Sequence, residues 1–174
     1  YAAAFGLRQE LTPQEQEALA GKANEIIRSH VLLAMTVSAI PSPAIDIFAV
    51  TVVEINMIAD LARLYQFCIP GDLVLAKILV SLASGIGLAY LSSKYASFIK
   101  ALPFAGPALY AAGLSVSGGI AVYAVGKLFE RHFESGGVFL STSNHSIRKF
   151  FNEKQVEGKS VVPALLIRTV APQS

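Results

Sequence analysis

The feature that most constrains this 174-residue chain is a long stretch without a charged side chain, residues 101–126. A helix over residues 107–126 is roughly 30 Å long at about 1.5 Å per residue, which is the thickness of a bilayer's hydrocarbon core. A second apolar run, residues 73–93, precedes it and contains one charged residue, Lys77. The two runs predict a long helical hairpin at the centre of the fold.

Both halves of this predicted hairpin carry small residues four positions apart, a spacing that places them on one face of a helix. Close helix packing is expected there, because small residues let two backbones approach each other. Each glycine in a helix interior costs about 1 kcal/mol relative to alanine, so close packing or an apolar medium must compensate. The predicted packing residues are Ser81, Gly85, Ala89 and Ser93 in the first half and Ala111, Ser115 and Gly119 in the second.

Two further helices are expected before the hairpin. Thr12 is a potential N-cap, Pro13 suits the first helical position, and Glu15 completes a capping box, so a helix is predicted from there to about Ala39. A Pro-Ser-Pro sequence then excludes helical conformation, and the next helix is predicted over residues 43–65. These two helices are expected to fold back on each other.

The charged residues of these two helices invite a pairing hypothesis. If the helices are antiparallel, Arg28 lies opposite the neighbourhood of Glu54, and an ion pair would offset the cost of burying either charge. Asp46 is placed to stabilise the positive end of its helix, and Asp60 is placed to contact Arg63. Asp46 and Glu54 are about 12 Å apart along one helix, too far to act on one bond as a carboxylate pair.

The predicted fold is all-α, built from helical hairpins, with a short irregular C-terminal tail. After the break at residues 102–107, the last long helix is expected to end at Gly136 and Gly137. Residues 142–154 suggest a short amphipathic helix, and residues 161–170, which contain Pro163, suggest an extended segment. We therefore expect a helical domain over residues 1–137 and a tail over residues 138–174 that packs on it or on a partner.

No pattern of catalytic, cofactor-binding or metal-binding residues is found. Gly158, Lys159 and Ser160 resemble the end of a phosphate-binding loop, but Glu153 stands where that motif needs its first glycine. Cys68 is the single cysteine, so no intrachain disulfide is possible. The histidines have no paired ligand spacing: His30, His132 and His145. The sequence predicts neither a metal nor another cofactor.

The composition of the chain argues against a nucleic-acid partner. Charged residues make up 15% of the chain and hydrophobic residues 53%, whereas an ordinary soluble domain has about 25% charged residues. The formal net charge is +2 and the Lys and Arg residues form no dense block, so a nucleic-acid surface is not expected.

Several segments resemble the YcjF-like domain, a bacterial domain of unknown function often found C-terminal to a GTPase domain. They are residues 26–31 (IIRSHV), 40–50 (IPSPAIDIFAV), 61–65 (LARLY), 102–106 (LPFAG) and 123–136. The resemblance covers about residues 20–137, and it departs from the family at Gln66, where a glycine is common. It implies an all-helical module at a bacterial inner or thylakoid-type membrane, frequently coupled to a GTPase, with no catalytic residues to transfer.

Three functional hypotheses follow. The leading one is a non-catalytic membrane module whose hairpin inserts into lipid and which anchors or regulates a GTPase or a larger membrane complex, with association between copies left open. The alternative is a soluble, compact helical bundle in the cytoplasm that acts as an interaction or assembly module. The third is an enzyme with a pocket formed only by the fold, for which perturbed titration of Glu54 or Asp60 would be the first sign.

Overall fold

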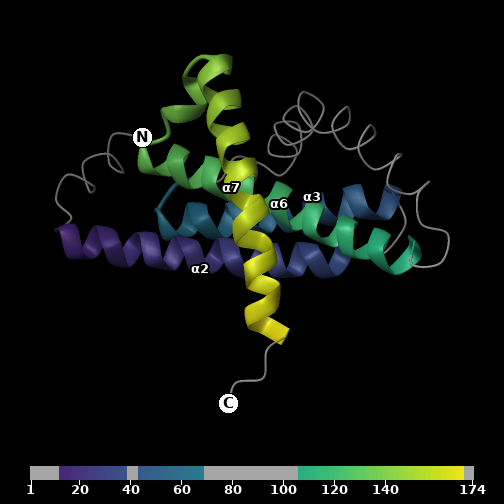
Figure 1. The fold of residues 1–174 in the computed structure, drawn as a ribbon. Coiled ribbons are helices and arrows are strands. Elements are labelled where there is room, and N and C mark those ends of the chain that lie inside the picture. Colours follow the sequence, from purple (N-terminus) through teal and green to yellow (C-terminus); the bar gives the residue numbers. More distant parts are fainter. Residues whose placement is uncertain (1–11, 39–42, 69–105, 171–174) are drawn as a thin grey trace.

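The computed structural model describes residues 12–38, 43–68 and 106–170 (Figure 1). These ranges are helical and contain no strand, which confirms the predicted all-α fold. The elements are α2 (Pro13–Ser38), α3 (Pro43–Leu64), α6 (Gly106–Glu134), the short 3-10 helix η1 (Phe139–Ser141) and α7 (Asn144–Val170).

The start of α2 is the predicted capping box. The Thr12 backbone N–H and hydroxyl donate to the Glu15 carboxylate at 2.8 and 2.7 Å, and the Glu15 N–H points back to the Thr12 hydroxyl at 3.4 Å. These contacts satisfy backbone donors that the first turn of a helix leaves free. They also hold the pKa of Glu15 below its usual value.

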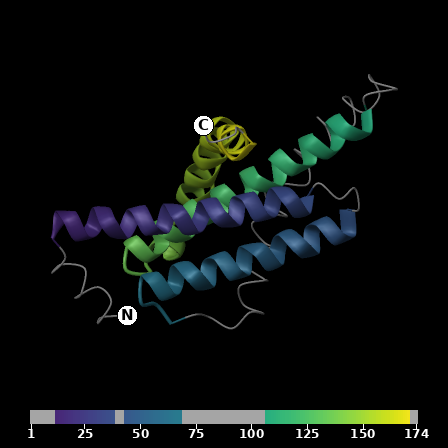
Figure 2. The same cartoon turned by 90° about the horizontal axis from the view of Figure 1, so that it is seen from below.

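Helices α2 and α3 run antiparallel, and α6 lies along both of them (Figures 1 and 2). Helix α7 crosses this group steeply and packs mainly on α6. One face of each helix supplies the core, and helical spacing explains which residues these are. Fully buried members include Ile27 and Val31 of α2, Met57, Ile58 and Leu61 of α3, Val122 and Leu128 of α6, and Val162 of α7.

The helix predicted over residues 142–154 is confirmed from Asn144 onward, but the predicted irregular tail with an extended segment over residues 161–170 is wrong, because residues 144–170 form one continuous helix that passes through Pro163. A proline inside a helix removes one backbone hydrogen bond. The buried residues of this helix nevertheless recur at helical spacing from its first turn to the residue before the proline: they are Ile147, Phe151, Gly158 and Val162. Their packing continues up to the proline, so tertiary contact outweighs the local preference of the sequence.

The predicted membrane-spanning hairpin is not confirmed. Within the described ranges, the structure has no helix with a stretch long and apolar enough to cross a bilayer. The first half of that hairpin, with Ser81, Gly85, Ala89 and Ser93, lies outside the described residues.

Candidate functional site

Helices α2, α6 and α7 approach one another closely at the small residues of α6. A Cβ atom added at Gly119 would lie 2.6 Å from Cγ of Met35 on α2 and 2.8 Å from Cγ1 of Val162 on α7. One added at the neighbouring Gly118 would overlap the side chain of Ser38. Three helices therefore meet around a position that has room for hydrogen alone.

The predicted stripe of small residues on α6 runs toward this meeting point. The Ser115 hydroxyl donates a hydrogen bond of 2.6 Å to the backbone carbonyl of Met35, and Gly119 follows one turn later. The backbone of Ala111 belongs to the same helix, while its side chain is outside the described part of the chain. The described contacts of Ser115 and Gly119 are thus to α2 and α7; packing on the other predicted stripe stays a prediction.

Arg28 and Glu54, the predicted ion pair, lie in different environments. Arg28 is exposed on the outer face of α2, while Glu54 on α3 is buried, with 8% of its surface exposed. Among the ion pairs of the described residues, none joins them. Burial raises the pKa of Glu54 to about 8.

A different polar contact joins α2 and α3. His30 Nε2 lies 3.7 Å from Oδ2 of Asp60, and Nδ1 lies 2.9 Å from the carbonyl oxygen of Ile26. A carbonyl accepts and never donates, so Nδ1 carries a proton and Nε2 faces the carboxylate. The other oxygen of Asp60 accepts from Arg63 at 2.8 Å, which confirms the predicted contact within α3.

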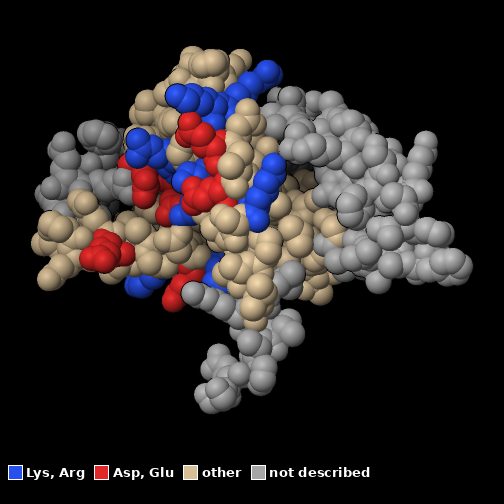
Figure 3. Space-filling view, viewed as in Figure 1, with Lys and Arg blue, Asp and Glu red and all other residues tan. Residues whose placement is uncertain are grey.

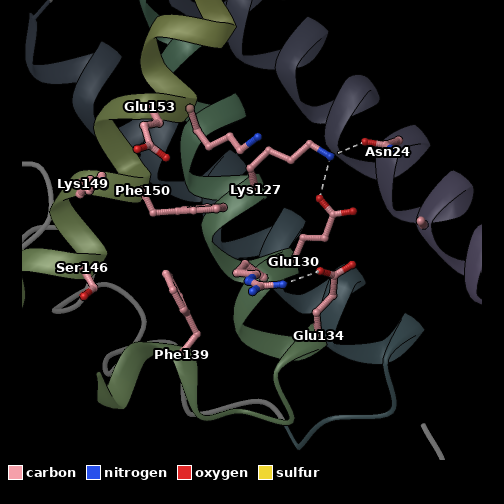
Figure 4. Close-up of a pocket in the computed structure, with 12 residues that line it drawn as sticks. Asn24, Lys127, Glu130, Glu134, Phe139, Ser146, Lys149, Phe150 and Glu153 are labelled. Atoms are coloured by element: carbon pink, nitrogen blue, oxygen red, sulfur yellow. Dashed lines mark hydrogen bonds and ion pairs between the residues drawn. The ribbon is translucent and has the colours of Figure 1, made fainter. Parts of the chain in front are cut away.

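Two polar contacts that the sequence analysis missed join α6 to its neighbours. Lys127 Nζ donates to Oδ1 of Asn24 on α2 at 2.5 Å and to Glu130 at 2.7 Å (Figure 4). The Tyr123 hydroxyl donates to Glu157 on α7 at 2.5 Å. The partners are far apart in sequence, so no local spacing signals them.

Burial and hydrogen bonding shift the pKa values of the acids in this region in opposite directions. Burial raises the pKa of Glu130, although the hydrogen bond from Lys127 opposes the shift. The pKa of Glu157 is lowered by the hydrogen bonds from Lys154 and Tyr123. Burial, with the Glu157 contact, raises the pKa of Tyr123 well above its ordinary value. These are the shifts of a structural network that pairs acids with bases.

A pocket of about 640 Å³ opens beside this network, between α2, α6, η1 and α7 (Figure 4). Its wall combines cations and acids with the rings of Phe139 and Phe150, which meet edge to face at 5.3 Å. Within the described chain, no three His, Cys, Asp or Glu residues are grouped so that they could hold a metal ion. The residues from α6 and α7 that line it include Lys127, Glu130, Arg131, Glu134, Lys149, Phe150, Glu153 and Lys154.

Charge is distributed very unequally along the three packed helices. Their uncharged segments are residues 31–38 of α2, 44–53 of α3, where Asp46 is the exception, and 106–126 of α6. Because α2 ends where α3 and α6 begin, these segments lie at the same end of the molecule, on the right in Figures 1 and 2. We call this the apolar end and the opposite one the charged end. Acidic side chains visible in Figure 3 lie toward the charged end.

Comparison with known proteins identifies the family. Residues 6–157 match the family described as a domain of unknown function, DUF697. Magnetosome membrane protein 22 of Magnetospirillum gryphiswaldense is 31% identical over 150 residues, which cover 86% of this chain and 76% of that protein. No solved structure matches the chain. The predicted resemblance to a domain of unknown function is confirmed, while the YcjF-like assignment and the GTPase association stay predictions. The chain belongs to the DUF697 family.

Proposed function

We propose that this chain is a non-catalytic, membrane-associated helical module whose apolar end enters a lipid bilayer. The observation that carries the proposal is that α2 and α6 bring uncharged segments to one end of the molecule, and α3 brings there a segment whose single charged residue is Asp46. Core packing alone requires an apolar face on each helix and leaves charge on the outer faces at both ends. A concentration of uncharged residues at one end is instead typical of a surface that enters lipid or meets another protein.

Side-chain exposure supports this role. Three exposed large apolar side chains lie at the apolar end, namely Phe48 (73% exposed), Leu33 and Val52, while Val138, Val156 and Ile167 are exposed elsewhere. Transfer of such side chains from water to lipid is favourable by roughly 25 cal/mol per Å² of apolar surface. The relative's printed name, a magnetosome membrane protein, points the same way.

The length of the apolar end determines how far it can reach into a bilayer. From Gly106 to Gly119, where α7 crosses, α6 extends for roughly 20 Å at about 1.5 Å per residue. One leaflet contributes about half of a hydrocarbon core of about 30 Å. An end of this length reaches past the first leaflet when α7 stays at the surface.

The charged end is then the part that faces water and meets a partner. It carries the pocket beside Lys127 and Glu130, together with the exposed outer face of the first turns of α2. We propose that a GTPase or a larger membrane complex is anchored or regulated through this end. The GTPase part of the proposal depends on the resemblance to the YcjF-like domain.

The absence of catalysis is also part of the proposal. The third hypothesis named perturbed titration of Glu54 as the sign of an enzyme, and its pKa is indeed raised, with burial as the cause. A catalytic acid also needs a partner group and access to a substrate. Glu54 is almost fully buried, so its titration is explained by its position in the core.

Single tryptophans test the insertion, because the chain has none of its own. Phe48→Trp places the reporter at the apolar end, and Val138→Trp, at a residue 56% exposed beyond the end of α6, is the matched control. With phosphatidylcholine vesicles that contain brominated acyl chains, the Phe48→Trp emission should shift to shorter wavelength and be quenched. The Val138→Trp emission should stay that of an indole in water.

The opposite outcome is equally clear. If both tryptophans keep their aqueous emission and the protein leaves the membrane fraction in carbonate, membrane insertion is refuted. A soluble bundle that acts as an interaction module is then the better account.

A further inference from the structure

Helix α7 crosses the molecule where the apolar end begins. Gly158 packs on Tyr123 and Ile120 of α6, and Val162 lies next to Gly119. The first charged residue of α6 after its apolar segment, Lys127, comes one turn after Tyr123. Because α7 runs steeply across α2, α3 and α6 (Figures 1 and 2), an end-on approach of the apolar end to a bilayer lays α7 nearly parallel to the membrane surface.

The two sides of α7 differ in charge. One side lines the pocket at the charged end through Lys149 and Glu153, and Glu157 follows on that side, where it binds Tyr123 and Lys154. Glu157 therefore faces away from the apolar end, whereas Glu153 also lines a surface groove together with Arg148 and Asn152. Figure 3 shows the acidic atoms gathered on this side of α7.

The opposite side of α7 carries cations. Arg148, Asn152, Gln155 and Lys159 recur at positions i, i+4, i+7 and i+11, which share one side of a helix. Since the pocket lies toward the charged end, this side faces the apolar end. Arg148, Asn152 and Lys159 are exposed, and Gln155 is partly buried.

We propose that this side of α7 binds the headgroups of anionic phospholipids and so sets the depth to which the apolar end enters the bilayer. The inference rests on the proposed function, because an anionic bilayer meets Arg148 and Lys159 only if the apolar end approaches it. Basic residues on the surface of an interfacial helix attract anionic lipid, while acids on the same side would oppose it. Glu157 lies on the other side of α7 and does not oppose lipid binding, and Glu153 is the one acid of α7 beside Arg148.

Binding to vesicles tests the inference, with two variants that lose the same number of charges. Arg148→Gln with Lys159→Gln removes the cations of the proposed lipid side. Lys22→Gln with Lys149→Gln removes two exposed cations elsewhere, on α2 and on the pocket side of α7. Each is made in the Phe48→Trp protein and titrated with phosphatidylcholine vesicles, with and without phosphatidylserine, and thermal unfolding checks that each variant folds.

The first variant should bind phosphatidylserine vesicles about 30-fold more weakly than the parent, at about fivefold per charge near the surface. Its binding to phosphatidylcholine alone should stay unchanged, and the control pair should lose less than about threefold. Equal losses in both variants, with Phe48→Trp still inserted, would overturn the inference and leave the proposed function standing. No insertion of Phe48→Trp in either vesicle would refute the proposed function and with it this inference.

Discussion

Gly119→Ala is the substitution that most directly probes how the helices meet. The added Cβ would lie 2.6 Å from Cγ of Met35 and 2.8 Å from Cγ1 of Val162, distances that side chains essentially never adopt. Met35 is flexible, and a change of its χ1 angle can move Cγ away from the added carbon. Val162 is β-branched and fully buried, so its rotamer is stiff and the clash there persists.

Two opposing terms set the size of the effect. Alanine favours the helix by about 1 kcal/mol over glycine. Overpacking a well-filled core by one carbon costs about 1 to 3 kcal/mol. With a cost near the middle of that range, Gly119→Ala lowers the free energy of unfolding by about 1 kcal/mol.

The chain offers a matched control in Gly21, which lies inside α2 on an exposed face with nothing within 4 Å of an added Cβ. Gly21→Ala carries the propensity gain without the clash, so it should raise the free energy of unfolding by about 0.5 to 1 kcal/mol. Urea titrations followed by far-UV circular dichroism, under one set of solution conditions, measure both variants against the parent.

Val162→Ala identifies the source of the cost. It removes the Cγ1 atom that lies 2.8 Å from the added carbon, so the double substitution with Gly119→Ala should be less destabilised than the sum of the two single ones, by at least about 0.5 kcal/mol. If Gly119→Ala instead stabilises the protein as much as Gly21→Ala, the close approach of α2, α6 and α7 is not a requirement of the fold. A small residue at position 119 is then not needed for the packing of these helices.

Two further predictions concern a buried acid and a helix end. Glu54 keeps its proton in the folded protein up to a pKa of about 8, while the unfolded chain releases it near 4.5; stability therefore falls as pH rises through this window, by at most about 1.4 kcal/mol per pH unit. Glu54→Gln should flatten that fall in urea midpoints measured between pH 5 and pH 8, and parallel profiles for variant and parent would contradict it. Thr12→Ala removes the capping box of α2 and should cost about 1 kcal/mol of local helix stability. Because residues 12–18 are exposed, the loss should appear as faster amide exchange in the first turns of α2 with little change in global unfolding, and a full loss of global stability would refute the local role.

The elements that sequence could predict are those with local signals. Thr12, Pro13 and Glu15 mark the start of α2 within one turn. Asp60 and Arg63, which lie three positions apart on α3, form the contact that this spacing predicts. The end of α2 at Ser38 lies just before the Pro-Ser-Pro sequence, and the end of α3 at Leu64 lies within one residue of the predicted end. Both contacts, Thr12 with Glu15 and Asp60 with Arg63, join residues three positions apart, so their geometry is known as soon as a helix is assumed.

Contacts between helices were not predictable in the same way. Arg28 and Glu54 were expected to meet from an assumed antiparallel arrangement, which is correct, but pairing also needs both side chains on the facing surfaces. Arg28 lies one position past the buried Ile27 and points outward. The contact that does form, His30 with Asp60, depends on the rotation of both helices, which apolar periodicity specifies only to about one residue.

The tail shows the opposite error, in which a local signal was given too much weight. Pro163 suggested an extended segment, whereas Ile147, Phe151, Gly158 and Val162 already carry the spacing of a helix that continues to the proline.

The position of that helix links the close approach to the proposed membrane role. Gly119 lets α7 lie directly against α6 and α2, and a bulkier residue there would lift α7 away from both. If α7 sets the depth of the apolar end, then Gly119→Ala should change membrane depth as well as stability, so the Phe48→Trp quenching profile in the Gly119→Ala protein should differ from that of the parent. An unchanged profile would mean that α7 does not limit insertion, whatever its charges bind.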